Sequence, residues 1–418
     1  MQANPKTYQI QLTTLVYGGE ALGRLPDGRA VFVPMALPGE TVNIRLIEEK
    51  RNHARAELLE VLEPSPERIT PRCAHFGLCG GCHYQHMPYE AQLAAKTAIL
   101  RDQLERIGRL REPSVLPAVP SPLPFNYRNY VQFHLTSQGR LGFHTILGDS
   151  LFELGECHLP EAVINTVWPQ LDFESLPELE RIGLRLGVDD DLQLILESSE
   201  AQPPEFSVED LTLSAVHLSA AGPLVLAGSE YVLIDILGRA FRVSAPSFFQ
   251  VNTLMAEAMV NYVLAHLARL HPLGPDSTVL DVYCGVGLFS AFLAQKAGRL
   301  IGVESSTSAV EDFINNLDEF ENVEIYEDAA EAVLPQLTLQ PDLILVDPPR
   351  SGLDRRALDG ILALAPETLV YISCDPATLS RDARRLTTGG YQLWQVTPFD
   401  LFPQTYHIES ISFWQRDR

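Results

Sequence analysis

The sequence predicts an α/β multidomain protein: a small N-terminal β-barrel, a central α+β region and a C-terminal doubly wound parallel sheet. Three observations predict this fold. Short strand-like runs separated by glycine and proline turns fill residues 7–62, and three cysteines gather in a glycine-rich loop soon after. From about residue 247, apolar strands alternate with helical patterns. We therefore expect three domains, at residues 1–65, 66–246 and 247–418.

The composition is that of a globular intracellular protein. An apolar fraction of 46% is ample for cores, yet no stretch reaches the roughly 18 uninterrupted apolar residues of a membrane span. Residues 1–5 contain no apolar segment of the kind that a signal peptide needs. We therefore expect a cytoplasmic protein without a membrane partner, acting as a monomer. In that compartment the six cysteines serve better as ligands or catalysts than as disulfides.

The N-terminal domain is predicted from strands and turns. Tyr8–Leu12 alternates polar and apolar residues, and Ala30–Val33 and Val42–Leu46 follow as further strands. So many strands in few residues favour a small barrel of the OB type, which is often a nucleic-acid module, over a generic β-domain. The net charge of −23 argues against loose binding of polyanions. A nucleic-acid partner would have to be held by a local basic surface and by shape.

The cysteines that follow have the spacing of a metal site. Cys73, Cys79 and Cys82 lie in one glycine-rich loop, and Cys157 stands alone far downstream. Three thiolates in a tight loop with one remote thiolate suit a 4Fe-4S cluster, whereas zinc prefers two close pairs. A zinc site with both cysteine and histidine ligands remains open, because three histidines lie nearby: His75, His83 and His86.

The rest of the central domain is predicted as a helix followed by strands. Residues 89–110 form an amphipathic pattern whose polar face includes Lys96 and Arg101, so this face is either solvated or an RNA contact. Residues 127–136 and 140–145 predict a hairpin. Two more strands are expected on either side of residues 189–191.

The C-terminal domain alternates strands with helices, and each strand ends in a polar residue. In a doubly wound sheet these ends gather at the edge where ligands bind. Cys374 follows the fifth strand, and Asp375-Pro376 then start a helix with a capping residue and a proline at its first position. The expected strands are residues 279–282, 300–304, 323–326, 343–346 and 370–373.

The cofactor is predicted from the first two strands. A glycine-rich turn after Asp281 and an acid, Glu304, ending the next strand fit a cofactor that contains adenosine, because the acid can accept both ribose hydroxyls. The dinucleotide fingerprint would need a third glycine where Ser290 stands. S-adenosylmethionine has no pyrophosphate to hold, so it fits better. Asp347-Pro-Pro-Arg350 after the fourth strand would hold a flat base beside the methyl donor.

Together these motifs resemble the RumA/TrmA family of RNA uracil-5-methyltransferases. The resemblance rests on residues 248–252, the Asp281 turn, Asp347-Pro-Pro-Arg350, residues 373–376 and residues 407–409. It implies a TRAM module at residues 1–65 and a 4Fe-4S cluster on the four cysteines, as in the ribosomal members. It also implies that Cys374 is the nucleophile and Glu409 the base. The implied cofactor or target-base residues are Gln250, Tyr283, Gly285, Glu304, Asp328 and Asp347.

Two positions depart from the family pattern. Leu288 stands where many members have a polar residue, and Asp375 replaces the usual Asn beside the nucleophile. The implied reaction is methylation of C5 of a uridine in 23S ribosomal RNA through a covalent bond from Cys374 to C6. Three alternatives stay open: the same chemistry on a tRNA T-loop uridine, methylation of a base amino group, and RNA binding without catalysis.

Overall fold

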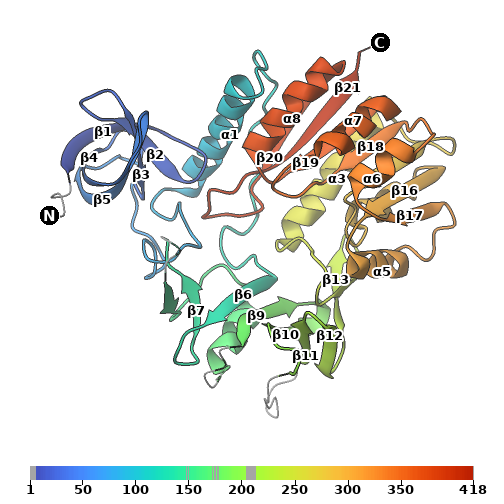
Figure 1. The fold of residues 1–418 in the computed structure, drawn as a ribbon, viewed down its shortest axis with the longest axis horizontal. Coiled ribbons are helices and arrows are strands. Elements are labelled where there is room, and N and C mark those ends of the chain that lie inside the picture. The colour runs from blue at the N-terminus through green and yellow to red at the C-terminus, as the bar shows by residue number, and fades with distance from the viewer. Residues whose placement is uncertain are drawn as a thin grey trace.

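The computed structural model describes residues 6–417 except 147, 149, 172, 174–175, 177 and 204–212. The expectation drawn from residues 1–5 lies outside the described residues. Figure 1 shows the N-terminal barrel at one end of the molecule, the C-terminal sheet at the other and the central sheet between and below them. No helix in the described part of the chain is long and apolar enough to cross a membrane.

The predicted barrel is confirmed. Five strands close in the order β1-β2-β3-β5-β4, and alternate residues such as Val31, Val33, Val42 and Ile44 fill the interior. The sequence did not indicate β2 and β5, because β2 contains Gly23 and β5 carries many charged residues. The strands are β1 (Thr7–Leu15), β2 (Glu20–Arg24), β3 (Ala30–Pro34), β4 (Thr41–Glu49) and β5 (His53–Glu63).

The central region contains a seven-stranded sheet in the order β12-β11-β10-β9-β6-β7-β8. The predicted hairpin is present as β6 and β7, and the predicted pair around residues 189–191 is β9 and β10. A short helix, α2 (Ala162–Val167), packs on this sheet. The strands are β6 (Tyr130–Leu135), β7 (Leu141–His144), β8 (Leu151–Glu153), β9 (Leu179–Leu186), β10 (Leu192–Ser198), β11 (Ser214–Ser219) and β12 (Gly222–Ala227).

The C-terminal region is the predicted doubly wound sheet. Its order is β17-β16-β15-β18-β19-β21-β20, parallel except for β21, which pairs antiparallel with β19 and β20. Successive residues of a strand point to opposite faces, so Val279 and Leu280 belong to different cores. The strands are β15 (Thr278–Val282), β16 (Arg299–Glu304), β17 (Val323–Glu327), β18 (Leu343–Val346), β19 (Thr368–Ser373), β20 (Tyr391–Phe399) and β21 (Glu409–Arg416).

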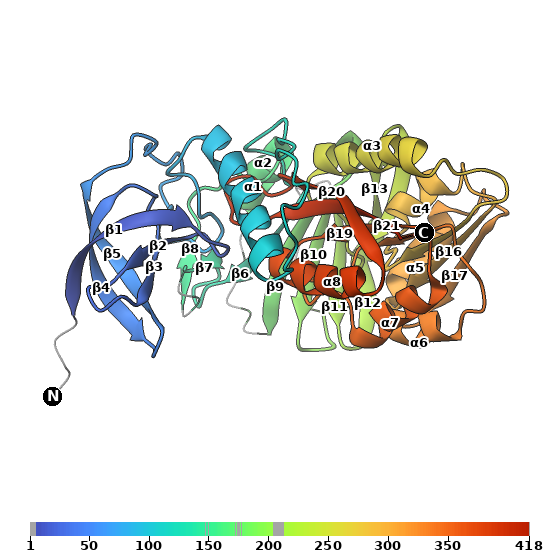
Figure 2. The ribbon, with the colours of Figure 1, turned by 90° about the horizontal axis from the view of Figure 1, so that it is seen from above.

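Helices cover both faces of this sheet, as Figure 2 shows. One face carries α3, α4, α5 and a separate hairpin of β13 and β14, and the other carries α6, α7 and α8. The elements are β13 (Tyr231–Ile236), β14 (Arg239–Ser244), α3 (Thr253–Leu270), α4 (Leu288–Leu293), α5 (Thr307–Asn316), α6 (Ala330–Val333), α7 (Arg355–Leu364) and α8 (Pro376–Thr388).

The first long helix, α1 (Tyr89–Arg106), packs in the C-terminal core. Leu100 and Leu104 join the residues of α7 and α8, and α1 lies beside α8 in Figure 2. The predicted polar face of α1 is not exposed along its whole length, because Lys96 is buried. The helix therefore connects the barrel to the C-terminal sheet by packing as well as by chain connectivity.

Candidate active site

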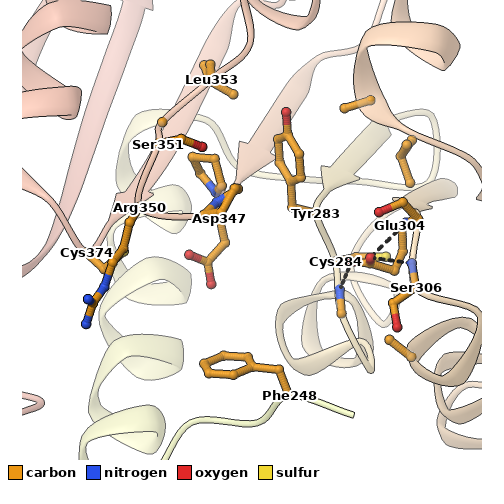
Figure 3. Close-up of a pocket in the computed structure, with 18 of the residues that line it drawn as sticks. Phe248, Tyr283, Cys284, Glu304, Ser306, Asp347, Arg350, Ser351, Leu353 and Cys374 are labelled. Carbon is orange, nitrogen blue, oxygen red and sulfur yellow. Dashed lines mark hydrogen bonds between the residues drawn. The ribbon is translucent and has the colours of Figure 1, made fainter. Parts of the chain in front are cut away.

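A cavity of about 1290 Å³ lies at the carboxyl ends of the parallel strands. It is lined by every residue that the sequence placed in a cofactor, target-base or catalytic role: Gln250, Tyr283, Gly285, Glu304, Asp328, Asp347, Cys374 and Glu409. Figure 3 shows Asp347, Arg350 and Cys374 on one side and the turn held by Glu304 on the other. The structure thus brings together residues that lie up to 159 positions apart in the chain.

The turn after β15 is held by Glu304. One carboxylate oxygen accepts a hydrogen bond from Gly285 N at 3.0 Å, and the other accepts from Ser305 N and Ser306 N at 2.7 and 2.8 Å. Gly287 has a φ of 92°, and a Cβ there would lie 2.5 Å from Leu317 Cδ1, so only glycine fits. Glu304 is therefore fixed at the cavity wall, and Oε2 has a lone pair left for a ribose hydroxyl.

Asp281 is a buried carboxyl with a polar partner on one side only. Its Oδ2 accepts from Ser290 Oγ at 2.6 Å, and its Oδ1 has no hydrogen-bond partner among the described residues. Burial raises the pKa of Asp281 to about 7, with the charge of Asp347 adding to the effect. Burial also raises the pKa of Asp347 to about 7. A cationic ligand would stabilise the charged forms of these two buried acids, so this part of the cavity is suited to a cation.

Ser290 explains the missing third glycine of the first turn. Its side chain is fully buried, and its hydroxyl donates to Asp281. A glycine there could not make this bond and would leave a second carboxylate oxygen unpaired. Ser290, the residue that argued against a dinucleotide cofactor, therefore helps to hold the carboxyl group of Asp281 in position.

Cys374 stands between β19 and α8 in a tightly bonded loop. Ser373 Oγ donates to the carbonyl of Asp375 at 3.0 Å and accepts from Asp375 N at 3.2 Å. Asp375 caps α8, because its Oδ1 accepts from Ala377 N and Thr378 N at 2.9 and 2.8 Å. The predicted helix start is confirmed, and the loop holds the thiol at the cavity wall.

The surroundings of Cys374 do not activate it by themselves. Burial raises the pKa of the thiol to about 12, and the negative charges of Glu409 and Asp347 add to this, while Arg350 acts in the opposite direction. A thiol with such a pKa is protonated at neutral pH. A helix N-terminus contributes only about 0.3–1 kcal/mol, so activation must come from what enters the cavity.

Glu409 begins the antiparallel strand β21. The β19–β21 ladder ends with Ser373 opposite Ser410, so the next residues along, Cys374 and Glu409, meet at the same edge of the sheet. Glu409 is 4% exposed. Burial raises its pKa well above the usual value, with the charge of Asp347 adding and Arg350 opposing. A carboxyl group with a raised pKa is a good proton acceptor once it is ionised.

The segment that leads into Glu409 is fixed by distant parts of the chain. Lys96 of α1 donates to Asp400 at 2.5 Å, and both side chains are buried. Gln404 exchanges two hydrogen bonds of 3.0 Å with Gln92 of α1, and its carbonyl accepts from His83 N and Tyr84 N, next to Cys82. No sequence pattern indicates these contacts, because they join residues more than 300 positions apart.

A second cavity, of about 1020 Å³, contains all four predicted metal cysteines: Cys73, Cys79, Cys82 and Cys157. Burial raises the pKa of Cys82 to about 12 and that of Cys157 to about 11, and neighbouring thiols of the set contribute to both shifts. In the described part of the chain, no group of three or more His, Cys, Asp or Glu residues has an arrangement that could hold a metal ion. The cluster therefore remains a prediction.

The histidines near these cysteines have other contacts. His75 Nε2 accepts from Gly155 N at 3.0 Å and Glu156 N at 3.3 Å. His83 packs edge-on against Tyr406, and His86 packs against Phe76. The four thiols share one cavity, and His75 and His83 line it too. His75 Nε2 is occupied, whereas His83 Nδ1 and both ring nitrogens of His86 have no hydrogen-bond partner among the described residues. A mixed cysteine and histidine site therefore stays open beside a group held by four thiolates.

Comparisons with known proteins agree with this geometry. The family model described as tRNA (Uracil-5-)-methyltransferase matches residues 229–417, and the TRAM domain model matches residues 4–59. The chain is 32% identical to an uncharacterized RNA methyltransferase of Gloeobacter violaceus, over 98% of this chain and 97% of the relative. It is 35% identical to one of Aquifex aeolicus, over 97% and 98%.

A solved structure shares the fold over nearly the whole length. It is the Pyrococcus abyssi tRNA (uracil-54, C5)-methyltransferase in complex with S-adenosyl-L-homocysteine. The TM-score is 0.74 at 23% sequence identity, covering 97% of this chain and 100% of the other. The likeness covers the barrel, the central sheet and the C-terminal sheet together.

Proposed function

Since the chain belongs to the tRNA (uracil-5-)-methyltransferase family of RNA methyltransferases, we propose that it transfers the methyl group of S-adenosylmethionine to C5 of a uridine in 23S ribosomal RNA. The observation that carries the chemistry is the meeting of Cys374 and Glu409 at one sheet edge, beside Asp347. The four cysteines support the ribosomal substrate through the family resemblance, whereas the barrel does not decide between substrates, because the Pyrococcus abyssi tRNA enzyme shares the fold over nearly the whole chain.

The proposed reaction begins at Cys374. Uracil C5 is too weak a nucleophile to take a methyl group unaided, so the Cys374 thiolate adds to C6 and turns C5 into an enolate carbon. C5 then attacks the methyl carbon, and the sulfonium sulfur keeps the electron pair of the broken bond, which gives S-adenosylhomocysteine. Asp347, which lines the same cavity, would accept a hydrogen bond from N3–H of uracil and so orient the ring.

Glu409 completes the reaction as the base. It removes the proton from C5, the C5–C6 double bond re-forms, and the Cys374 thiolate leaves; the proton passes from Glu409 to solvent. Methyl transfer removes the positive sulfonium from the cavity. Because a nearby positive charge lowers the pKa of a carboxyl, its loss makes Glu409 more basic at the step that needs a base. Burial of Glu409 strengthens this electrostatic effect.

The acidic cavity suits the methyl donor. We assign Gln250, Tyr283, Gly285 and Asp328 to its pocket together with Glu304, which would accept a hydrogen bond from a ribose hydroxyl. The sulfonium and amino groups of S-adenosylmethionine are cations. The buried carboxyls Asp281 and Asp347 would compensate them, and Oδ1 of Asp281 gains a partner.

We further propose that Cys73, Cys79, Cys82 and Cys157 hold a 4Fe-4S cluster. Such a cluster would cross-link the loop at 73–82 to residue 157 and so stabilise the central domain. No step of methyl transfer needs it. The division into domains at 1–65, 66–246 and 247–418 is likewise proposed; α1 and the β13–β14 hairpin contribute to the core of the third domain.

A tRNA uridine is the second candidate substrate. It is favoured by the shared architecture with the Pyrococcus abyssi tRNA enzyme. Mapping 5-methyluridine in ribosomal and transfer RNA from cells lacking the gene separates the two: loss at a 23S site supports the proposal, and loss at a T-loop uridine selects the alternative. Methyl transfer to a base amino group, or RNA binding without turnover, would leave no 5-methyluridine change in either RNA.

A further inference from the structure

The N-terminal barrel reaches the candidate active site through one side chain. Tyr17, in the turn between β1 and β2, donates its hydroxyl hydrogen to Oδ2 of Asp375 at 3.0 Å. Asp375 is the residue directly after Cys374. The bond joins positions 358 residues apart, so it is a contact of the folded protein and not of local sequence.

This bond completes the hydrogen bonding of the Asp375 carboxylate. Its Oδ1 is occupied by Ala377 N and Thr378 N, and its Oδ2 by Tyr17. Three donors therefore hold a negative charge that stands beside the Cys374 thiol. Hydrogen bonds to a carboxylate stabilise its charge and fix its orientation. Without Tyr17, one oxygen of Asp375 would be free to act on the thiolate.

The position of Tyr17 is set by close packing. Its ring lies edge-on to Tyr406 at 5.6 Å between centroids, and Tyr406 contacts His83 and His407. The turn that follows is also seated closely, since a Cβ at Gly19 would lie 3.0 Å from Cβ of His83. The Tyr17 side chain thus touches both the cap next to Cys374 and the segment that leads to Glu409.

We propose that Tyr17 is a positioning residue for the reaction at Cys374, so that the barrel is a structural part of the catalytic centre as well as a nucleic-acid module. This inference rests on the proposed role of Cys374. The charged groups that face the thiol are Glu409, Asp347, Asp375 and Arg350. Those that face Tyr17 are Asp375, Tyr406 and Arg350. Among these groups, Asp375 is the one that accepts a hydrogen bond from the Tyr17 hydroxyl.

The test is a double-mutant cycle with Tyr17→Phe and Asp375→Asn in the full-length protein. Single-turnover methyl transfer is measured at saturating RNA and cofactor between pH 6 and pH 9. Tyr17→Phe alone should slow transfer about tenfold, the usual size of one charge-assisted hydrogen bond, and move the pH midpoint of the rate upward. With Asp375→Asn, which retains the cap oxygen but not the charge, Tyr17→Phe should change the rate less than about twofold.

The matched control is Tyr8→Phe, which removes a hydroxyl from the opposite end of β1 in the same barrel. It should leave the rate and pH midpoint unchanged. Cofactor affinity and thermal unfolding of every variant show whether the fold is intact.

Three results would overturn the inference. Equal slowing by Tyr17→Phe in both backgrounds would mean that the hydroxyl acts through general packing of the barrel. A change only in RNA affinity would mean that Tyr17 contacts the RNA, and no change at all would mean that its bond to Asp375 has no effect on the reaction. Failure of the unmodified protein to methylate would instead refute the proposed function.

Discussion

Cys374 and Glu409 meet at one sheet edge because the antiparallel register of β19 and β21 places Ser373 opposite Ser410. An acid next to a nucleophilic thiol disfavours the thiolate, and the charge of Glu409 does raise the pKa of Cys374. The arrangement makes sense if the two groups act in sequence on adjacent carbons of one ring. The thiol then needs its charge only when the substrate is bound, and the acid needs its charge only after methyl transfer.

The first prediction concerns the nucleophile. RNA that carries 5-fluorouridine at the target site should trap a covalent complex, because fluorine cannot leave as a cation. Cys374→Ala should form no complex, measured by denaturing gel electrophoresis. Cys284→Ala, which removes the other thiol of the cavity, is the control and should still be trapped. Equal adduct yield from Cys374→Ala would remove the nucleophile assignment.

The second prediction concerns the buried acids of the cofactor cavity. Burial raises the pKa values of Asp281 and Asp347 to about 7, so both carboxyls are partly protonated at neutral pH. Binding of cationic S-adenosylmethionine lowers these pKa values and releases protons, whereas S-adenosylhomocysteine, which lacks the sulfonium, releases fewer. The ratio of the two affinities should therefore shift toward S-adenosylmethionine between pH 6 and pH 8.

Isothermal titration in buffers of different ionisation enthalpy measures this proton release directly. Asp281→Asn cannot ionise and should flatten the pH dependence. An affinity ratio that stays constant over this range would show that the two acids do not respond to the sulfonium.

The third prediction concerns the buried pair between α1 and the segment before Glu409. Lys96→Met leaves Asp400 as a buried charge without its partner, which should lower the free energy of unfolding by about 3–5 kcal/mol. Lys50→Met is the control: its ion pair with Glu48 is exposed, so its effect should be much smaller than that of Lys96→Met. Urea unfolding of both proteins gives the comparison, and similar midpoints would contradict it.

The sequence indicated the residues that line the candidate site better than it indicated the contacts that hold those residues in position. Glu304, Asp347 and Cys374 could be placed because each ends or directly follows a strand, and parallel strands bring their ends to one edge. The contacts of Tyr17 and Lys96 could not be predicted. Their partners, Asp375 and Asp400, come close only when the barrel and α1 pack against the C-terminal domain. Amphipathic periodicity assigned Lys96 to a polar face. In the structure Lys96 is buried instead, because it forms an ion pair with the buried Asp400, the residue after β20.

The fourth prediction concerns the four cysteines. Protein purified without oxygen should contain about four irons and four sulfides per chain, and Cys157→Ser should lose them. Cys284→Ser, which changes a cysteine outside that cavity, should keep them. Iron and sulfide analysis gives the count. Stoichiometric zinc without iron in the same preparation would replace the cluster with a zinc site.

The last prediction separates the base from the nucleophile. In the proposed reaction, C5 carries both the methyl group and its original proton after methyl transfer, and Cys374 is still bonded to C6. Glu409→Gln keeps size and hydrogen bonding but lacks a basic carboxylate. It should methylate ordinary RNA at most about once and remain as a denaturation-resistant adduct that already contains the labelled methyl group.

The contrast with the other variants makes this result specific. Cys374→Ala should transfer no methyl group, and Glu304→Gln, which weakens cofactor binding, should slow methylation without accumulating an adduct. If Glu409, which is buried at the edge where Cys374 is held, is the base for the C5 proton, loss of its carboxylate should act after alkylation and not before. If Glu409→Gln turns over normally, or stops before the methyl group moves, a different residue removes the C5 proton.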